Sequence, residues 1–217
     1  MPYYKKLIGK KCYLSPCSVD DAQTWTQWDN DLEVTIPLGD EAYQPMPLDK
    51  QREWLADAIK RQAHLFDIVD SETDTLIGRC MLFSINNVDR TAMLGICIGE
   101  KAYWNKGYGQ DAISLLLDYG FNLLNLNSIM LGTFAFNERA IRCYKKVGFK
   151  EIGRRRQGRI IAGQAYDCVL MDILAAEYTS VYVKGLIEQY APEKPKKMGM
   201  SASERGARQQ RLGKNIR

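Results

Sequence analysis

An apolar run that passes through a glycine-containing turn into a helical pattern constrains the fold of this chain more than any other stretch. Leu94–Gly99 is apolar enough for a buried strand, and the turn after it carries Gly107 and Gly109. From there to Leu124, apolar residues recur at helical spacing, which predicts a helix with a broad buried face. The first amides of a helix are unpaired and carry partial positive charge, and glycines let an anion approach them. The stretch therefore predicts an anion-binding turn.

The other segments predict an α/β (α+β) fold with one mixed, mostly antiparallel sheet. Apolar runs of strand length are joined by tight turns and alternate with helical patterns, an order that places helices on both faces of the sheet. Ser18 with Asp21 resembles a capping box, and Gly148 is placed to end a helix in the left-handed conformation. Seven strands are expected, over 7–14, 65–69, 76–85, 92–99, 128–134, 149–156 and 166–173, with helices over 18–30, 48–61, 107–124 and 138–147.

Composition and charge indicate one domain followed by a basic tail. The chain has 217 residues, 46% hydrophobic and 26% charged, an ordinary globular profile. Residues 191–217 hold eight Lys or Arg against two Asp or Glu, a balance of +6, so residues 1–190 account for −2 of the net +4. We expect a domain over 1–178 with 179–190 as its extension. We expect 191–217 to be a disordered tail, because it has almost nothing apolar to bury.

The sequence argues against several classes of protein. No apolar run approaches the ~20 residues that cross a bilayer, and the first residues lack the apolar core of a signal peptide, so we expect no membrane contact and a cytoplasmic protein. The six cysteines show no C-x-x-C spacing and mostly lie in apolar patterns where free thiols are common. His64 is the single histidine, so we expect no metal site.

Two motifs in a fixed order resemble the GNAT superfamily of N-acetyltransferases. Trp104–Gly109 resembles the Q/R-x-x-G-x-G/A loop that binds the pyrophosphate of acetyl-CoA. Asn137–Phe149, with Asn137 and Tyr144, resembles the downstream motif of the same superfamily. The likeness covers about residues 7–178 and is nearest to the branch with the ribosomal-protein and spermidine N-acetyltransferases. It implies a GNAT-like fold and direct transfer of acetyl from acetyl-CoA to a primary amine in a ternary complex.

The resemblance implies a role for each motif residue. The strand end would bind the pantetheine arm through its backbone, and the turn amides would hold the pyrophosphate. Asn137 would also bond the pantetheine arm, although it could equally cap the helix after it. Tyr144 would protonate the leaving thiolate as a general acid, whereas spacing alone would make it a core residue. The implied cofactor-binding residues are Ile98, Gly99, Lys106, Gly107, Tyr108, Gly109, Gln110, Asn137 and Lys146.

Two positions depart from the resembled pattern. Trp104 stands where the loop begins with Gln or Arg, and Met93 stands where that branch often carries a glutamate. Methionine cannot accept a proton, while an amine of pKa ~10.4 is mostly protonated at neutral pH. A general base must therefore come from elsewhere or be a chain of waters. The candidates are Asp29, Asp31, Glu33 and Glu41.

Acidic residues between the first two predicted helices form the expected acceptor site. Residues 29–43 hold five carboxylates and no Lys or Arg. One hypothesis is that this acidic rim attracts a cationic amine, and the other is that it is an ordinary solvated loop. The substrate-binding residues under the first hypothesis are Asp31, Glu33, Glu41 and Tyr43.

Three questions are left open by the sequence. The acceptor is either the α-amine of a protein N-terminus or a small polyamine-like amine. The alternative function is a non-catalytic acetyl-CoA-binding module that recruits RNA or a ribosomal partner through its basic tail. That tail either contacts RNA or the ribosome or is a flexible solubilising end. The resemblance also implies a homodimer through the C-terminal strands.

Overall fold

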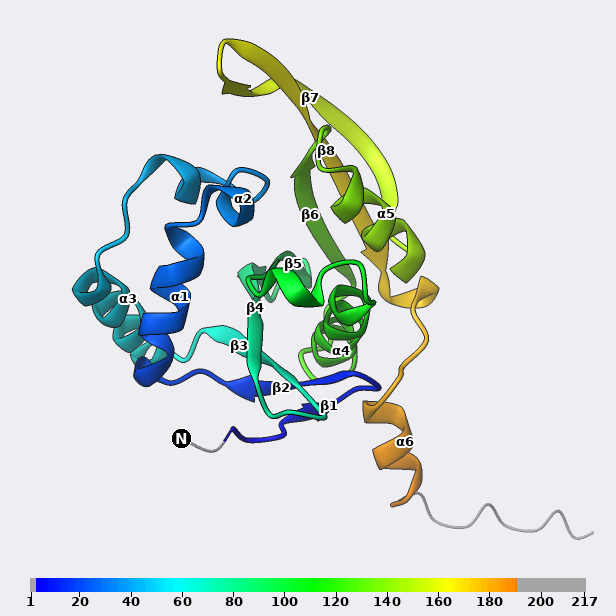
Figure 1. Ribbon diagram of the computed structural model, residues 1–217. Coiled ribbons are helices and arrows are strands. Elements are labelled where there is room, and N and C mark those ends of the chain that lie inside the picture. The colour runs from blue at the N-terminus through cyan, green and yellow to red at the C-terminus, as the bar shows by residue number, and fades with distance from the viewer. Residues whose placement is uncertain (1–2, 191–217) are drawn as a thin grey trace, which may run out of the picture. The chain divides into compact units, whose positions relative to one another are not determined.

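One eight-stranded sheet organises the protein in the computed structural model, which describes residues 3–190 (Figure 1). Its strand order is β1-β2-β3-β4-β5-β6-β8-β7. Every neighbouring pair is antiparallel except β5 and β6, which confirms the predicted mixed, mostly antiparallel α/β fold. The strands are β1 (Leu7–Ile8), β2 (Cys12–Pro16), β3 (His64–Asp70), β4 (Leu76–Asn86), β5 (Thr91–Ile98), β6 (Ser128–Phe134), β7 (Lys150–Ile161) and β8 (Gln164–Leu174). The helices are α1 (Ala22–Asp29), α2 (Leu32–Thr35), α3 (Leu48–Lys60), α4 (Tyr108–Asn122), α5 (Glu138–Val147) and α6 (Val183–Glu188).

The prediction of seven strands is wrong by one, because the expected first strand over 7–14 is a tight hairpin. Its two arms are β1 and β2, and the chain reverses at Gly9, whose N–H donates to the carbonyl of Cys12 at 2.9 Å. A Cβ at Gly9 would lie 2.4 Å from the Asp111 carboxylate, so only glycine fits there. Because apolar residues lie on both sides of this turn, residues 7–14 were predicted as a single strand.

Helices cover both faces of the sheet, as predicted (Figure 1). On one face, Trp25 of α1 and Leu55 of α3 form a buried cluster with Leu65 of β3. On the other face, α4 packs on β4 and β5, and α5 joins the same cluster through Tyr144. The two clusters draw on alternate residues of the central strands, as the pleat of a sheet requires.

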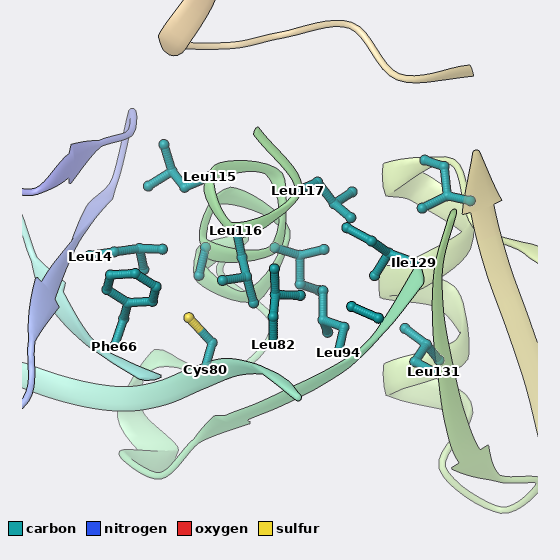
Figure 2. Close-up of a cluster of buried hydrophobic side chains, with 14 of the residues drawn as sticks. Leu14, Phe66, Cys80, Leu82, Leu94, Leu115, Leu116, Leu117, Ile129 and Leu131 are labelled. Carbon is teal, nitrogen blue, oxygen red and sulfur yellow. The ribbon is translucent and has the colours of Figure 1, made fainter. Parts of the chain in front are cut away.

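The position of α4 is fixed by its apolar side. Figure 2 shows Leu115, Leu116 and Leu117 gathered with Leu82 and Leu94 of the sheet. The three leucines of α4 are fully buried. Burying one leucine side chain contributes about 1.5–3 kcal/mol, so the helix and the turn before it are held firmly on the sheet.

The one parallel pair of strands separates soon after it begins. β5 pairs with β6 only where Thr91–Met93 lies beside Ser128–Met130. On its other edge β5 stays paired with β4 as far as Ile98. The later part of β5 therefore has no strand partner on the β6 side, which leaves its backbone groups there available to a ligand.

The remaining predictions concern the ends of the chain and its covalent state. The chain divides into two units, Met1–Gly185 and Leu186–Arg217. The predicted boundaries at 178 and 190 stay predictions, and the predictions of a disordered tail and of RNA contact concern 191–217, outside the described residues. Within residues 3–190 no helix is long and apolar enough to cross a membrane. All six cysteines are unpaired.

Candidate active site

The turn before α4 presents unpaired backbone donors. Asn105 and Gly107 both have positive φ, 60° and 89°, which turns the chain sharply into the helix. No side chain caps α4 at Gly107, and the first backbone bond at this end runs from the N–H of Asp111 to the carbonyl of Gly107 at 3.1 Å. The amides of Tyr108–Gln110 have no partner among the described residues. The predicted anion-binding turn therefore has the geometry to hold a phosphate.

A cavity of about 1000 Å³ begins at this turn. It passes between the separated ends of β5 and β6 and reaches the segment that joins α1 to α3. Tyr144 and Met93 line it near the gap between the strands. Of the predicted cofactor residues, Gly99 and Lys106 do not line it, while Ile98, Gly107, Tyr108, Gly109, Gln110, Asn137 and Lys146 do.

Two tryptophan side chains contact the backbone at the end of β5. The indole N–H of Trp104 donates to the carbonyl of Ile98 at 2.7 Å. A Cβ at Gly99 would lie 2.0 Å from the ring of Trp28, so this glycine makes room for an aromatic side chain. Trp28 in turn donates to Glu100 at 2.9 Å. The two residues assigned to the pantetheine arm therefore also serve the packing of this end of the sheet.

The side chain of Asn137 forms hydrogen bonds within the protein. Its Oδ1 accepts from the N–H of Ala140 at 3.2 Å, which makes it the N-cap of α5. Its Nδ2 donates to the carbonyl of Pro37 at 3.3 Å, across the cavity from α5. The capping role considered from the sequence is thus present, and the same side chain joins α5 to the segment after α2.

Tyr144 lies on the buried side of α5, facing the cavity. Its ring is 5.9 Å from that of Phe149, and its hydroxyl makes no hydrogen bond to a described residue. Burial raises the pKa of the Tyr144 phenol above its ordinary value, with smaller contributions from Cys143 and Cys97. The phenol therefore stays protonated at neutral pH and has a proton to donate.

Two cations of α5 line the cavity and were not singled out from the sequence. Arg139 and Arg142 face it together with Lys146, at the spacing that places residues on one side of a helix. The guanidinium of Arg139 lies 3.7 Å from the ring centroid of Trp104. Extending the helical period of Lys146 back along α5 would have found both arginines, which lie four and seven residues before it. Arg142 pairs with Glu138 at 2.9 Å, whereas Arg139 and Lys146 form no ion pair with a described residue, so these two charges suit an anion at the glycine turn.

The acidic rim predicted over 29–43 is largely paired with cations. Asp29 forms a buried two-bonded pair with Arg79, at 2.5 and 2.9 Å. Asp31 pairs with Lys101 at 2.8 Å, and Glu33 pairs with the same lysine. Neither Asp31 nor Glu33 lines the cavity. Three of the four candidate bases, Asp29, Asp31 and Glu33, are therefore held in ion pairs.

Glu41 is the predicted acceptor residue that lines the cavity. It is half-buried and forms no ion pair with a residue in the described part of the chain. Asp40 also lines the cavity, but its side chain is 92% exposed and lies 3.8 Å from Arg159. Tyr43 stacks on Arg159 at 4.2 Å and donates its hydroxyl proton to the carbonyl of Ile160, outside the cavity lining.

No metal ligand set accompanies these residues. Between residues 3 and 190, no group of three or more His, Cys, Asp or Glu side chains is placed to hold a metal ion. The chemistry offered by the described residues is thus a set of amide donors, a buried phenol and a carboxylate along one cavity.

Comparison with known proteins gives a family and several relatives. Residues 11–150 match the acetyltransferase (GNAT) domain family. The uncharacterized N-acetyltransferase p20 of Bacillus licheniformis is 27% identical over 174 residues, which cover 79% of this chain and 97% of that protein. The spermidine N(1)-acetyltransferase of Escherichia coli (strain K12) is 37% identical over 101 residues, which cover 46% of this chain and 54% of that enzyme. The spermidine N-acetyltransferase from Vibrio cholerae, solved in complex with CoA and spermine, has a TM-score of 0.70 and 28% identity, covering 77% of this chain and 97% of that one.

Proposed function

This chain belongs to the acetyltransferase (GNAT) family, and on that premise we propose that it transfers the acetyl group of acetyl-CoA to a primary amine of a small, polyamine-like cation. One observation carries the proposal. A single cavity joins the unpaired amides of the glycine turn to the carboxylate of Glu41 and passes Tyr144 on the way. Acetyl-CoA bound at the turn and an amine attracted by Glu41 could therefore meet inside one cavity.

The amide donors of the turn account for the binding of acetyl-CoA. Tyr108, Gly109 and Gln110 direct unpaired N–H groups outward at the positive end of α4, where a diphosphate would bind. Arg139 and Lys146 add positive charge from α5. The acyl-pantetheine arm would then extend into the gap between β5 and β6, which brings the thioester toward Tyr144.

Transfer needs proton movements at the nitrogen and at the sulfur and no covalent enzyme intermediate. The acceptor ammonium would first give one proton to a base, and the neutral nitrogen would attack the thioester carbonyl carbon, so that a C–N bond forms and the C–S bond breaks. Tyr144 would give its phenolic proton to the departing thiolate, and the second proton that the nitrogen loses as the amide forms would restore the phenol. Holding both reactants in one cavity can supply about 7–11 kcal/mol of the barrier.

Of the four candidate bases, Glu41 is the one that lines the cavity and forms no ion pair with a described residue. Met93 lines the cavity at the position where the resembled branch often has glutamate, and it cannot accept a proton. Asp29 is held by Arg79, and Asp31 is held by Lys101 outside the cavity. Glu41 would take the proton directly or through a water.

A cationic small amine is the acceptor class that we favour over a protein N-terminus. Two of the relatives compared above are named for acetylation of spermidine, and one was solved with spermine bound. The carboxylate of Glu41, which lines the cavity and is not paired with a described cation, would attract a cationic amine. The non-catalytic alternative is not favoured, because the relatives are named as enzymes.

An acceptor screen tests the proposal. Release of CoA thiol from acetyl-CoA would be measured with the full chain in the presence of spermidine, spermine, monoamines and peptides with free N-termini. Polyamines should give the highest kcat/KM, and the acetylated product should appear by mass spectrometry. Peptide acetylation without polyamine acetylation would contradict the acceptor class, and no thiol release with any amine would contradict the enzymatic function itself.

A further inference from the structure

We propose that Asp70, the last residue of β3, is a positioning residue that holds the glycine turn in its cofactor-binding conformation through the hydroxyls of Tyr103 and Tyr108. The inference rests on the proposed function, because it takes CoA as the ligand of the turn. Asp70 is 2% exposed and does not line the cavity, so it would act on the ligand only through the residues that it holds.

The two tyrosines lie on either side of the turn in sequence and meet in space. Tyr103 ends a short 3₁₀ helix, Lys101–Tyr103, and Tyr108 is the first residue of α4. Their ring centroids are 5.0 Å apart and the rings meet edge to face, at 81°. Both side chains belong to residues that line the cavity. The segment between them is therefore a loop whose two ends are joined by aromatic contact.

One buried carboxylate receives the hydroxyls of both tyrosines. Tyr108 donates to Oδ1 of Asp70 at 2.9 Å, and Tyr103 donates more weakly to Oδ2 at 3.5 Å. Burial opposes ionisation of Asp70, but hydrogen bonds from Thr73 and Tyr108 outweigh it and lower the pKa of the carboxyl group. Burial and Asp70 together raise the pKa of Tyr108 to about 12. The bond thus joins an ionised carboxylate to a protonated phenol, which makes it stronger than a bond between neutral groups.

Asp70 is itself fixed by the sheet and by the turn between β3 and β4 (71–75). It lies opposite Cys12 in the β2–β3 pair, and its backbone N–H donates to the carbonyl of Thr75 at 2.9 Å. Its Oδ2 also accepts the hydroxyl of Thr73 at 2.6 Å, which fixes the orientation of the carboxylate. A group supported in this way can hold Tyr108 in one position.

The anchored segment contains both left-handed residues of the turn. Asn105 and Gly107 lie between the two tyrosines, with φ of 60° and 89°. This conformation costs free energy at Asn105, because Asn105 carries a side chain, and it persists where the surrounding structure holds it. The hydrogen bonds to Asp70 hold both ends of the segment, and Tyr108 supplies the first of the unpaired amides. Without these bonds the amides should be less well directed at a diphosphate, while the reacting groups stay in place.

Calorimetric titration of the full chain with CoA, together with steady-state kinetics, tests the inference. Asp70→Asn keeps the shape of the side chain and removes its charge, so the CoA dissociation constant and the KM for acetyl-CoA should rise about tenfold. The kcat at saturating acetyl-CoA should stay within about twofold of wild type, because binding is affected and the chemical step is not. Tyr108→Phe deletes only the hydroxyl and should have a similar effect. The double variant should bind CoA no more weakly than the weaker single variant, because both changes remove the same bond.

Asp74→Asn is the matched control. Asp74 lies in the same turn between β3 and β4 and accepts the hydroxyl of Tyr13 at 2.9 Å, the same distance as in the bond from Tyr108 to Asp70. Neither Asp74 nor Tyr13 lines the cavity. This variant should lose a comparable free energy of unfolding in urea and leave the CoA dissociation constant unchanged.

Three results would overturn the role of Asp70 while the proposed function stands. They are CoA affinities of Asp70→Asn and Tyr108→Phe within about twofold of wild type, losses that multiply in the double variant, and an equal loss in Asp74→Asn. Should Asp70→Asn fail to fold, the comparison of Tyr108→Phe with Asp74→Asn decides in the same way. Absence of CoA binding by wild type would overturn the proposed function and this inference together.

Discussion

The indole N–H of Trp104 donates to the carbonyl oxygen of Ile98 at 2.7 Å. This bond lies at the end of β5, beyond the part that pairs with β6, and the guanidinium of Arg139 lies 3.7 Å from the centroid of the same ring. The residue that departs from the Gln/Arg of the resembled loop therefore joins the strand, the glycine turn and α5. Trp104 also lines the cavity.

Replacing Trp104 with Phe should weaken both the fold and cofactor binding. The change keeps a ring for Arg139 but removes the donor to Ile98, which costs about 1 kcal/mol for a lost hydrogen bond. We expect a lower free energy of unfolding in urea and a raised KM for acetyl-CoA. Trp25→Phe is the matched control, because it also removes an indole donor, to Asp67 at 3.1 Å, while Trp25 does not line the cavity; it should lower stability and leave the KM unchanged. An unchanged KM in Trp104→Phe would contradict this role.

The phenol of Tyr144 should matter for the chemical step and not for cofactor binding. Tyr144→Phe removes the proton donor to the thiolate and keeps the ring that packs on Phe149. Loss of a general acid should lower kcat by about 100-fold or more, with the CoA dissociation constant within about twofold. Tyr119→Phe is the control, because it deletes a hydroxyl that bonds His64 at 2.7 Å instead of facing the cavity. Equal kcat in the two variants would rule out the acid role.

Charge at the far end of the cavity should govern the acceptor. Glu41→Gln should raise the KM for spermidine by about tenfold, because a charged hydrogen bond is lost, and should lower kcat if Glu41 also accepts the proton. Glu33→Gln makes the same chemical change outside the cavity, at a residue already paired with Lys101. The KM of that variant should stay near the wild-type value. A similar rise in both variants would show that general surface charge is responsible.

A buried carboxyl group should make stability depend on pH. Burial, aided by Asp21, raises the pKa of Asp67 to about 9, and the indole N–H of Trp25 donates to one of its oxygens at 3.1 Å. The unfolded pKa is about 3.9, so between these values the native state holds a proton that the unfolded state lacks. The free energy of unfolding from this group is therefore greatest below about pH 4 and falls as the pH rises toward 9.

Asp67→Asn removes this titration, because an amide stays neutral. Urea unfolding at about pH 5 and about pH 8 should show the variant gaining stability relative to wild type at the higher pH, by up to about 1.4 kcal/mol per pH unit. A difference between the two proteins that stays constant over that range would mean that Asp67 is ionised throughout.

Patterns among residues close together in the sequence were enough to predict several helix ends correctly. The capping box of Ser18 with Asp21 and the left-handed Gly148 at the end of α5 are both present, because each depends on residues close in the chain. The long apolar period of α4 and the glycines before it likewise predicted the helix and the turn at its start, where the structure has unpaired amides. These features need no knowledge of distant segments.

The charge state of the proposed acceptor site depends on distant residues and could not be predicted from the sequence. Asp29 meets an arginine fifty positions later, and Asp31 meets Lys101, so a stretch without Lys or Arg in sequence is neutralised in space. The hairpin at Gly9 was missed for a related reason. Its glycine is required by the carboxylate of Asp111, about a hundred residues away, and not by its neighbours.

The central claim is that the amides at the start of α4 and the cavity beside them bind CoA. Calorimetric titration of CoA into wild type, Gly109→Leu and Gly153→Leu tests it most directly. A Cβ at Gly109 meets only Cys143 and Ile98, at 3.5 and 3.9 Å, so the variant should fold while its side chain fills the cavity; a Cβ at Gly153 meets nothing within 4 Å. The account predicts binding to wild type and Gly153→Leu and a loss of about 100-fold or more in Gly109→Leu. No binding to wild type, or equal binding to all three proteins, would contradict it.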